Sequence, residues 1–226
     1  MDENFIGWLQ YLWSLMPIMM KGFQITLELF FKTILWALPL GLIIALMNIS
    51  KFWPFRAIGK TYVWILRGTP LLLQLFFVYY GLPYVPVIGV VLDRFPAAVL
   101  TFVLNYSAYF SEIFRAGILS IEHGQYEAAR SSGMTGFQMM TRIILPQTIR
   151  RVIPPISNET ITLVKDTALV NSIGLFELLQ AAKSSVNRDV DATAFLLAAL
   201  FYLIFTLVLT LIFNAIEKKN SKHEIR

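Results

Sequence analysis

Three ionisable side chains stand close together in a mostly apolar stretch: Glu159, Lys165 and Asp166. Inside a membrane-spanning helix each such group costs roughly 2.5–3.5 kcal/mol on insertion scales, so each needs a structural or functional reason. One reason is pairing with a neighbouring helix. The other is binding a zwitterion such as a free amino acid, because Lys suits a carboxylate and Asp or Glu suits an ammonium. We predict that all three line a substrate pathway, with Asn158 and Thr167 beside them, although Lys165 also suits a gate.

A second candidate site interrupts another apolar run, at residues 67–70. Its proline removes a backbone donor and its glycine loosens the helical turn, so backbone groups near Thr69 become free. They could bind a carboxylate, or the interruption could be a packing kink. Asn105 supplies a further polar group in the next apolar run. We predict that Arg67, Thr69 and Asn105 also belong to the pathway.

Two other pairs of charges have helical spacing. Glu112 and Arg115 are three residues apart, and Glu28 and Lys32 are four apart. Side chains at these spacings share one face of a helix and can pair. We predict that both pairs are mainly structural.

The composition explains why charges are informative here. Of 226 residues, 57% are hydrophobic and 15% are charged, whereas soluble domains carry about 25% charged residues. The sequence has no cysteine and two histidines, which argues against disulfides, thiolate chemistry and a metal site. We therefore expect an all-α membrane protein that has no metal and no cofactor of its own.

A spanning helix needs roughly 20 mostly apolar residues. The sequence predicts five such spans, at residues 24–47, 61–82, 97–119, 149–173 and 193–216. Residues 1–21 are apolar and aromatic but too short to span securely, so we predict a helix in the membrane interface, with a sixth span as the alternative. The transmembrane domain then covers residues 22–217, and residues 218–226 form a tail.

The basic residues in the loops and at the ends of the spans predict an orientation. Twelve Lys and Arg fall on one side of the predicted spans and four on the other. Because the more basic side is cytoplasmic, the N-terminus is expected outside and the C-terminus inside. The basic residues that set the membrane topology thereby explain the net charge of +5, so this charge does not require binding to nucleic acid.

The longest cytoplasmic connection, residues 120–146, is expected to be helical. Residues 125–132 are rich in helix formers, and Gly133 suits the end of that helix. Thr135 and Gln138 have the spacing of a capping box for a second helix at 136–142. These two short helices could be an inert connection or a docking element for a cytoplasmic partner.

Fixed positions in this connection resemble the signature loop of ABC importer permeases. They are Glu127, Ala128, Ala129, Gly133, Ile143, Leu145 and Pro146. Four further segments, 67–70, 80–83, 108–117 and 163–169, are similar to the polar amino-acid permease family. The resemblance covers about residues 22–216. It implies the type I importer fold, a five-helix core with a cytoplasmic coupling helix, used as a homodimer or paired with a related permease.

By this resemblance, residues 127–133 form the coupling helix, which sits in a cleft of a separate ATP-binding subunit. The expected coupling residues are Glu127, Ala128, Ala129, Gly133, Leu145 and Pro146. The sequence has no Gly-x-x-x-x-Gly-Lys-Ser/Thr loop, so ATP and Mg²⁺ would be bound by that partner. An extracytoplasmic amino-acid-binding protein would deliver the substrate, and the second permease subunit would complete the pathway. The assembly would lie in the lipid of a bacterial cell membrane.

The substrate that the resemblance implies is a polar amino acid. Residues 80–83 and 165–167 look similar to cystine-type permeases, while glutamine, histidine and arginine remain open. A secondary transporter or channel that works without ATP is the main alternative, and a membrane-embedded enzyme is a weaker one. The spacing of the signature-loop positions favours an ABC importer over these alternatives. The chain would then be a transport subunit without enzymatic activity.

Overall fold

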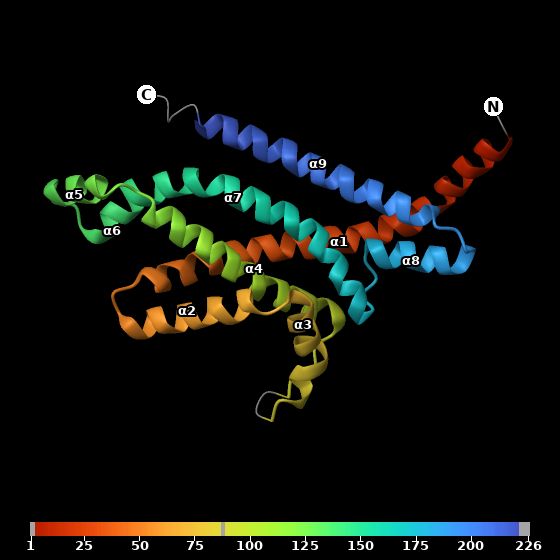
Figure 1. Cartoon of the computed structure of the whole chain (residues 1–226), viewed down its shortest axis with the longest axis horizontal. Coiled ribbons are helices and arrows are strands. Elements are labelled where there is room, and N and C mark those ends of the chain that lie inside the picture. Colours follow the sequence, from red (N-terminus) through yellow and green to blue (C-terminus); the bar gives the residue numbers. More distant parts are fainter. Residues whose placement is uncertain (1–2, 87–88, 222–226) are drawn as a thin grey trace. The chain divides into compact units, whose positions relative to one another are not determined.

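A computed structural model describes residues 3–86 and 89–221, and every regular element in these ranges is helical. Figure 1 shows the α-helices. They are α1 (Glu3–Ile49), α2 (Trp53–Gly68), α3 (Leu71–Phe76), α4 (Arg94–Leu119), α5 (His123–Ser131), α6 (Gly136–Met139), α7 (Leu145–Asp166), α8 (Leu178–Asp189) and α9 (Thr193–Ser221). Shorter turns of π-helix are η1 (Phe77–Gly81) and η3 (Met140–Ile144), and turns of 3-10 helix are η2 (Leu82–Tyr84) and η4 (Thr167–Ile173). The all-α expectation is confirmed.

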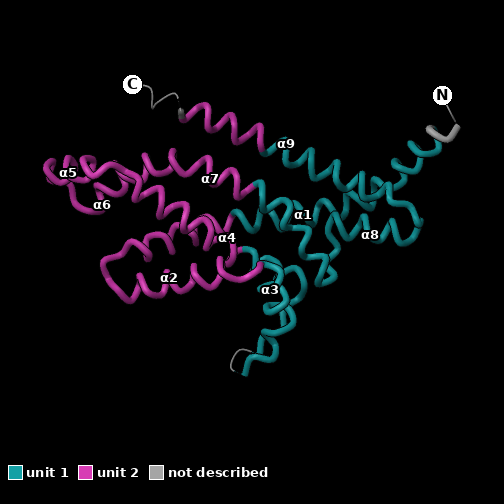
Figure 2. The backbone as a smooth tube through the Cα atoms, in the orientation of Figure 1, with its two compact units in different colours: residues 1–34, 71–102, 161–209 teal, residues 35–70, 103–160, 210–226 magenta. Residues whose placement is uncertain are grey.

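The helices are shared between two compact units, coloured separately in Figure 2. The first unit comprises residues 1–34, 71–102 and 161–209, and the second comprises residues 35–70, 103–160 and 210–226. Helices α1, α4, α7 and α9 each contribute residues to both units.

In the first unit, α1 packs against α8 and the beginning of α9. Leu15 and Met19 of α1 are fully buried in one cluster with Leu178 and Ala181 of α8. A Cβ at Gly22 would lie 2.9 Å from the Ala181 Cβ. This glycine is therefore what allows α1 to approach α8 so closely.

In the second unit, α2 and α4 pack on the second half of α1. Ile44, Val63 and Ala108 form the shared buried cluster. The hydroxyl of Tyr62 lies 2.7 Å from Ser107 Oγ and donates a 2.9 Å hydrogen bond to the Leu104 carbonyl. These bonds satisfy polar groups inside the apolar packing and fix α2 against α4.

The first expected span is longer than predicted, because α1 runs without interruption from Glu3 through Pro17 to Ile49. The segment 1–21 is therefore continuous with the first span, from residue 3 onward. Its placement in the membrane interface stays a prediction. Pro17 costs the helix one backbone bond, to residue 13, and this does not end α1.

Within the residues that the structure describes, three helical segments are long and apolar enough to cross a membrane: Ile6–Ile49, Arg94–Leu119 and Thr193–Asn220. A fourth is counted if Trp53–Gly68 and Leu71–Tyr84, which are bent by 103°, form one broken span. The third and fifth predicted spans correspond to α4 and α9. The predicted span at 149–173 is divided into α7 and η4, and α8 was not anticipated as a helix, so the total of five spans stays a prediction.

The short helices of the connection 120–146 form as the residues predict. Helix α5 begins two residues before the predicted position, and Gly133 follows it with φ of +72°, where glycine carries no Cβ penalty. Thr135 Oγ1 accepts from the Gln138 N–H, and the Thr135 N–H donates to Gln138 Oε1 at 2.9 Å, which completes the capping box. Helix α6 then ends at Met139, because the next turn is the π-helical η3.

Candidate functional site

A cavity of about 500 Å³ lies in the second unit and gathers five charged side chains from three helices. The end of α2, the second half of α4 and the first half of α7 line it. The lining residues are Arg67, Tyr109, Glu112, Ile113, Arg115, Ala116, Gly117, Ser120, Arg151, Val152, Pro155 and Glu159. We call it the ion-pair cavity, because three arginines and two glutamates face it.

Helical periodicity explains how α4 and α7 present these groups. Arg151, Pro155 and Glu159 are each four residues apart on α7, so they lie along one face. Tyr109 and Glu112 have the equivalent three-residue spacing on α4. Gly117 permits close packing of the two helices at one end of the cavity, because a Cβ there would collide with Val152.

Glu112 is the electrostatic centre of the ion-pair cavity. Its carboxylate accepts hydrogen bonds from Arg115 Nε at 3.0 Å and Nη2 at 2.8 Å, which confirms the predicted pair. Arg67 Nη1 lies 4.0 Å from the same carboxylate, and the Arg67 guanidinium lies 5.1 Å from the centre of the Tyr109 ring. Glu112 therefore also connects α4 to the end of α2, a role that its spacing did not reveal.

The interruption at residues 67–70 is a true break between α2 and α3. Helix α2 ends at Gly68, and Thr69 is extended, with φ of −120° and ψ of 146°. The Thr69 hydroxyl donates a 2.8 Å bond to the Ile65 carbonyl, and Asn105 Nδ2 donates a 3.0 Å bond to the Leu66 carbonyl. Thr69 and Asn105 thus satisfy the last carbonyls of α2 and help to fix the position of Arg67.

The predicted pathway residues divide between the two units. Arg67 and Glu159 line the ion-pair cavity together, whereas Asn158, next to Glu159, is exposed. Lys165, Asp166 and Thr167 belong to the first unit. Of these, Thr167 is fully buried and donates a 2.6 Å bond to the Val164 carbonyl, Asp166 is half-buried and Lys165 is exposed.

Sequence reasoning assigned Glu112 and Arg115 to structure and Arg151 to topology, and it overlooked the ring of Tyr109 as a partner for Arg67. The four-residue spacing of positions 151, 155 and 159 could have shown that Arg151 and Glu159 lie on the same face of a helix. That this face meets α2 and α4 could be seen only in the tertiary structure.

The connection 120–146 presents a second candidate surface. The side chain of Glu127 is 73% exposed, with Oε1 3.8 Å from His123 Nδ1, and Ala128 is exposed beside it. Ala129 points the other way and is 4% exposed. The Tyr126 hydroxyl donates a 3.0 Å bond to the Ile118 carbonyl and thereby holds α5 to the end of α4. Ala129 therefore packs inside this unit, and its role in coupling stays a prediction.

Phe137 is a surface residue that sequence reasoning missed. It lies on α6, beside α5 (Figure 1), and is 79% exposed. An exposed aromatic side chain on α6, together with exposed Glu127 and Ala128 on α5, gives this surface the mixed apolar and charged character of a protein interface. Leu145 and Pro146, at the start of α7, are half-buried and exposed, respectively.

These features are typical of a membrane transport subunit. The protein is helical, its spanning helices line a charged cavity, and a compact helical surface lies beside them. The chain belongs to the family described as binding-protein-dependent transport system inner membrane component, which matches residues 37–222. Members of this family are permease subunits of ABC importers, in which a separate ATPase hydrolyses ATP. The type I importer fold and the absence of an enzymatic role are thereby confirmed.

Named relatives agree with this assignment. The L-cystine transport system permease protein TcyB of Bacillus subtilis is 41% identical over 93% of this chain and 89% of its own length. The arginine transport system permease protein ArtQ of the same organism is 40% identical over 90% of this chain and 92% of its own. A solved structure, described as an amino acid ABC transporter with histidines, is 34% identical, has a TM-score of 0.85 and matches 97% of this chain and all of that one.

Proposed function

We propose that this chain forms half of the translocation pathway of an ATP-driven importer for a polar amino acid. The ion-pair cavity is the observation that carries the proposal. Three arginines and two glutamates line it, so one positive charge is left over, on helices that otherwise suit a membrane. A zwitterion needs both signs at one place, and ionisable residues within membrane-spanning helices mark substrate paths in membrane proteins.

Within the cavity, the charges differ in how strongly they are paired. Arg115 is held by Glu112 through bonds of 2.8 and 3.0 Å, while Arg67 is 4.0 Å from that carboxylate. Arg151 donates to the neutral Ser120. Arg67 and Arg151 are therefore best placed to receive the substrate carboxylate, and Glu159 to receive its ammonium.

The remaining predicted residues take supporting places in this proposal. Thr69 and Asn105 position Arg67 by capping α2. Asn158 is next to Glu159 in α7. Lys165, Asp166 and Thr167 belong to the first unit and are proposed as pathway residues in their own right, because Lys165 and Asp166 offer charges of both signs to a zwitterion.

The surface around Glu127 is proposed to dock into an ATP-binding subunit, which holds ATP and Mg²⁺. Exposure of Glu127, Ala128 and Phe137 supports this role. An extracytoplasmic binding protein delivers the amino acid, and a second permease subunit, identical or related, completes the pathway by alternating access. The excess of basic residues supports an orientation in which α5, α6 and the C-terminus are cytoplasmic and the N-terminus is outside.

Cystine is the substrate we propose to test first, because a relative named for L-cystine transport is 41% identical to this chain. The arginine-system relative is 40% identical, so identity alone does not rank the two. The cavity recognises the groups that both amino acids share, the α-carboxylate and the α-ammonium.

The test is uptake into proteoliposomes that contain this chain, its ATP-binding subunit and its binding protein, with radiolabelled cystine, arginine, glutamine and histidine. We expect ATP-dependent uptake of one of them, reduced at least tenfold by Arg67→Gln. Uptake that needs no ATP would favour a secondary transporter instead. Uptake unaffected by Arg67→Gln would remove the ion-pair cavity from the pathway.

A further inference from the structure

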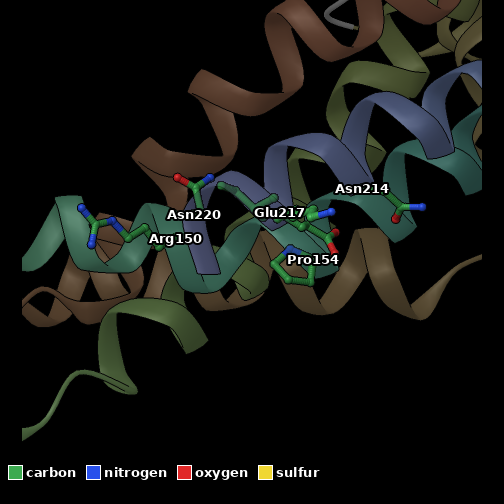
Figure 3. A pocket seen from close by; sticks show the side chains of 7 residues that line it. Arg150, Pro154, Asn214, Glu217 and Asn220 are labelled. Atoms are coloured by element: carbon green, nitrogen blue, oxygen red, sulfur yellow. The ribbon is translucent and has the colours of Figure 1, made fainter. Parts of the chain in front are cut away.

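A second cavity, of about 450 Å³, lies in the second unit between the beginning of α7 and the end of α9. It shares no lining residue with the ion-pair cavity. Its lining residues are Arg150, Ile153, Pro154, Asn214, Glu217, Lys218 and Asn220. Figure 3 shows Arg150 and Asn220 towards one end of this terminal cavity, Asn214 towards the other, and Pro154 and Glu217 between them.

The length of α9 places the terminal cavity at the edge of the membrane. The candidate span Thr193–Asn220 has 28 residues, or about 42 Å at 1.5 Å per residue, which exceeds a hydrocarbon core of about 30 Å. Leu211 and Ile212 are exposed apolar residues that suit lipid chains. The polar residues that follow, from Asn214 onward, therefore reach the depth of lipid headgroups.

The lining groups match a phosphodiester. Arg150 and Lys218 supply positive charge, and the amides of Asn214 and Asn220 supply neutral donors. Glu217 does not cancel this character fully, because its single negative charge faces the two positive charges of Arg150 and Lys218. Its Oε1 also accepts a 3.1 Å hydrogen bond from Ser157 Oγ. Basic pockets between helices at a membrane surface are suited to anionic headgroups.

The same cavity also offers acceptors. Pro154 has no N–H, so it cannot give the Arg150 carbonyl its usual helical bond. That carbonyl and the Glu217 carboxylate can accept from hydroxyl groups. A headgroup that carries both a phosphate and hydroxyls, as phosphatidylglycerol does, satisfies the donors and the acceptors together.

We propose that the terminal cavity binds the headgroup of an anionic phospholipid of the phosphatidylglycerol type, with its phosphate on Arg150 and Lys218. The bound lipid bridges α7 and α9 within this unit. Since α7 also carries Glu159, occupancy by the lipid stabilises a helix of the ion-pair cavity without contacting the substrate.

Native mass spectrometry of the delipidated protein, titrated with phosphatidylglycerol or phosphatidylcholine, tests this proposal. We expect phosphatidylglycerol to bind with preference, and the double variant Arg150→Gln/Lys218→Gln to weaken that binding roughly tenfold. The matched control is Lys51→Gln/Lys219→Gln, which loses the same charge outside the cavity and should bind as the unaltered protein does.

Three results would overturn the proposal: equal binding of both lipids, equal losses in the two double variants, or displacement of the lipid by millimolar inorganic phosphate, which would assign the site to a soluble anion. If the Arg150/Lys218 variant does not fold, Asn214→Leu replaces it. That variant keeps every charge and should still weaken phosphatidylglycerol binding, whereas unchanged binding would contradict the site. Because the readout is lipid binding, failure here leaves the transport proposal untouched.

Discussion

Arg67 Nη1 lies 4.0 Å from Glu112 Oε2, the oxygen that also accepts a 2.8 Å hydrogen bond from Arg115 Nη2. One carboxylate thus holds two guanidinium groups, one on the broken end of α2 and one on its own helix. The charge of Glu112 offsets the repulsion that Arg67 and Arg115 would otherwise exert on each other.

Glu112→Gln should therefore damage both the ion-pair cavity and the fold. The amide keeps the shape but loses the charge, so the two arginines repel each other. We expect uptake to fall at least tenfold and the free energy of unfolding to fall by roughly 1 kcal/mol, because the pair is only partly buried. Uptake assays and thermal unfolding in detergent measure the two effects.

Glu28→Gln is the matched control for that change. Glu28 pairs with Lys32 at 2.6 Å, with the two side chains 44% and 47% exposed, and neither residue lines the cavity. Its loss should change stability by less than about 0.5 kcal/mol and leave uptake nearly unaltered. Equal effects of the two variants would show that Glu112 is an ordinary ion pair.

Glu159→Gln should weaken recognition of the substrate ammonium. Glu159 lines the ion-pair cavity, while neighbouring Asn158 is exposed. We expect the substrate concentration for half-maximal uptake to rise about tenfold in the Gln variant, and to stay within twofold in Glu28→Gln, which does not line the cavity. ATP-binding subunits should assemble normally with both. Unchanged concentration dependence in Glu159→Gln would give Glu159 a structural role.

The surface of α5 and α6 should be needed for coupling and not for membrane insertion. Glu127→Lys reverses an exposed charge, and Phe137→Ala removes an exposed ring. We expect Glu127→Lys to abolish ATP-dependent uptake and Phe137→Ala to reduce co-purification of the ATP-binding subunit severalfold, since aromatic residues often dominate interfaces.

Phe52→Ala is the control for Phe137, because Phe52 is also an exposed phenylalanine, in the turn before α2. It should leave co-purification unchanged. Membrane fractions should contain all these variants in normal amounts. Loss of Glu127→Lys from the membrane would mean that α5 is required for insertion, against this account.

Glu177 should make stability depend on pH. It lies between η4 and α8, fully buried, and its carboxylate accepts from the N–H groups of Leu179 at 2.8 Å and Gln180 at 2.7 Å and from the Tyr202 hydroxyl at 3.0 Å. Burial outweighs these bonds and raises the pKa of Glu177 from 4.5 to about 7. The folded protein then binds a proton more tightly than the unfolded chain does.

The sign of this effect follows from linkage. Stability from the protonated carboxyl is complete below about pH 4.5 and is lost as the pH rises to about 7, by at most roughly 3 kcal/mol. Glu177→Gln removes the titration but keeps a neutral side chain. The difference in melting temperature between the original protein and this variant should therefore change between pH 5 and pH 8. A constant difference would contradict the raised pKa.

Short-range interactions could be predicted from the sequence, because they join residues only a few positions apart in the chain. The capping box of Thr135 and Gln138 needs only a spacing of three, and the Glu112–Arg115 pair needs only one face of a helix. The break after Gly68 likewise followed from Pro70.

Relationships between helices could not be predicted, because they depend on packing. The sequence analysis gave Ala128 and Ala129 the same expected coupling role. In the structure, the hydrogen bond of Tyr126 anchors α5 so that Ala129 faces inward and Ala128 is exposed. Arg151 looked like a topology signal until α4 and α7 brought it to the cavity with Glu112. The coupling roles of both alanines stay predictions, and the structure adds that Ala129 faces inward.

Co-purification followed by ATP hydrolysis tests the central claim most directly. The tagged chain is extracted from membranes, and its partners are quantified before hydrolysis is measured with and without the binding protein and each amino acid. We predict a stoichiometric ATP-binding subunit, lost in Glu127→Lys, and hydrolysis stimulated by one loaded binding protein. A chain that purifies without an ATPase and still moves amino acids in the absence of ATP would contradict the account.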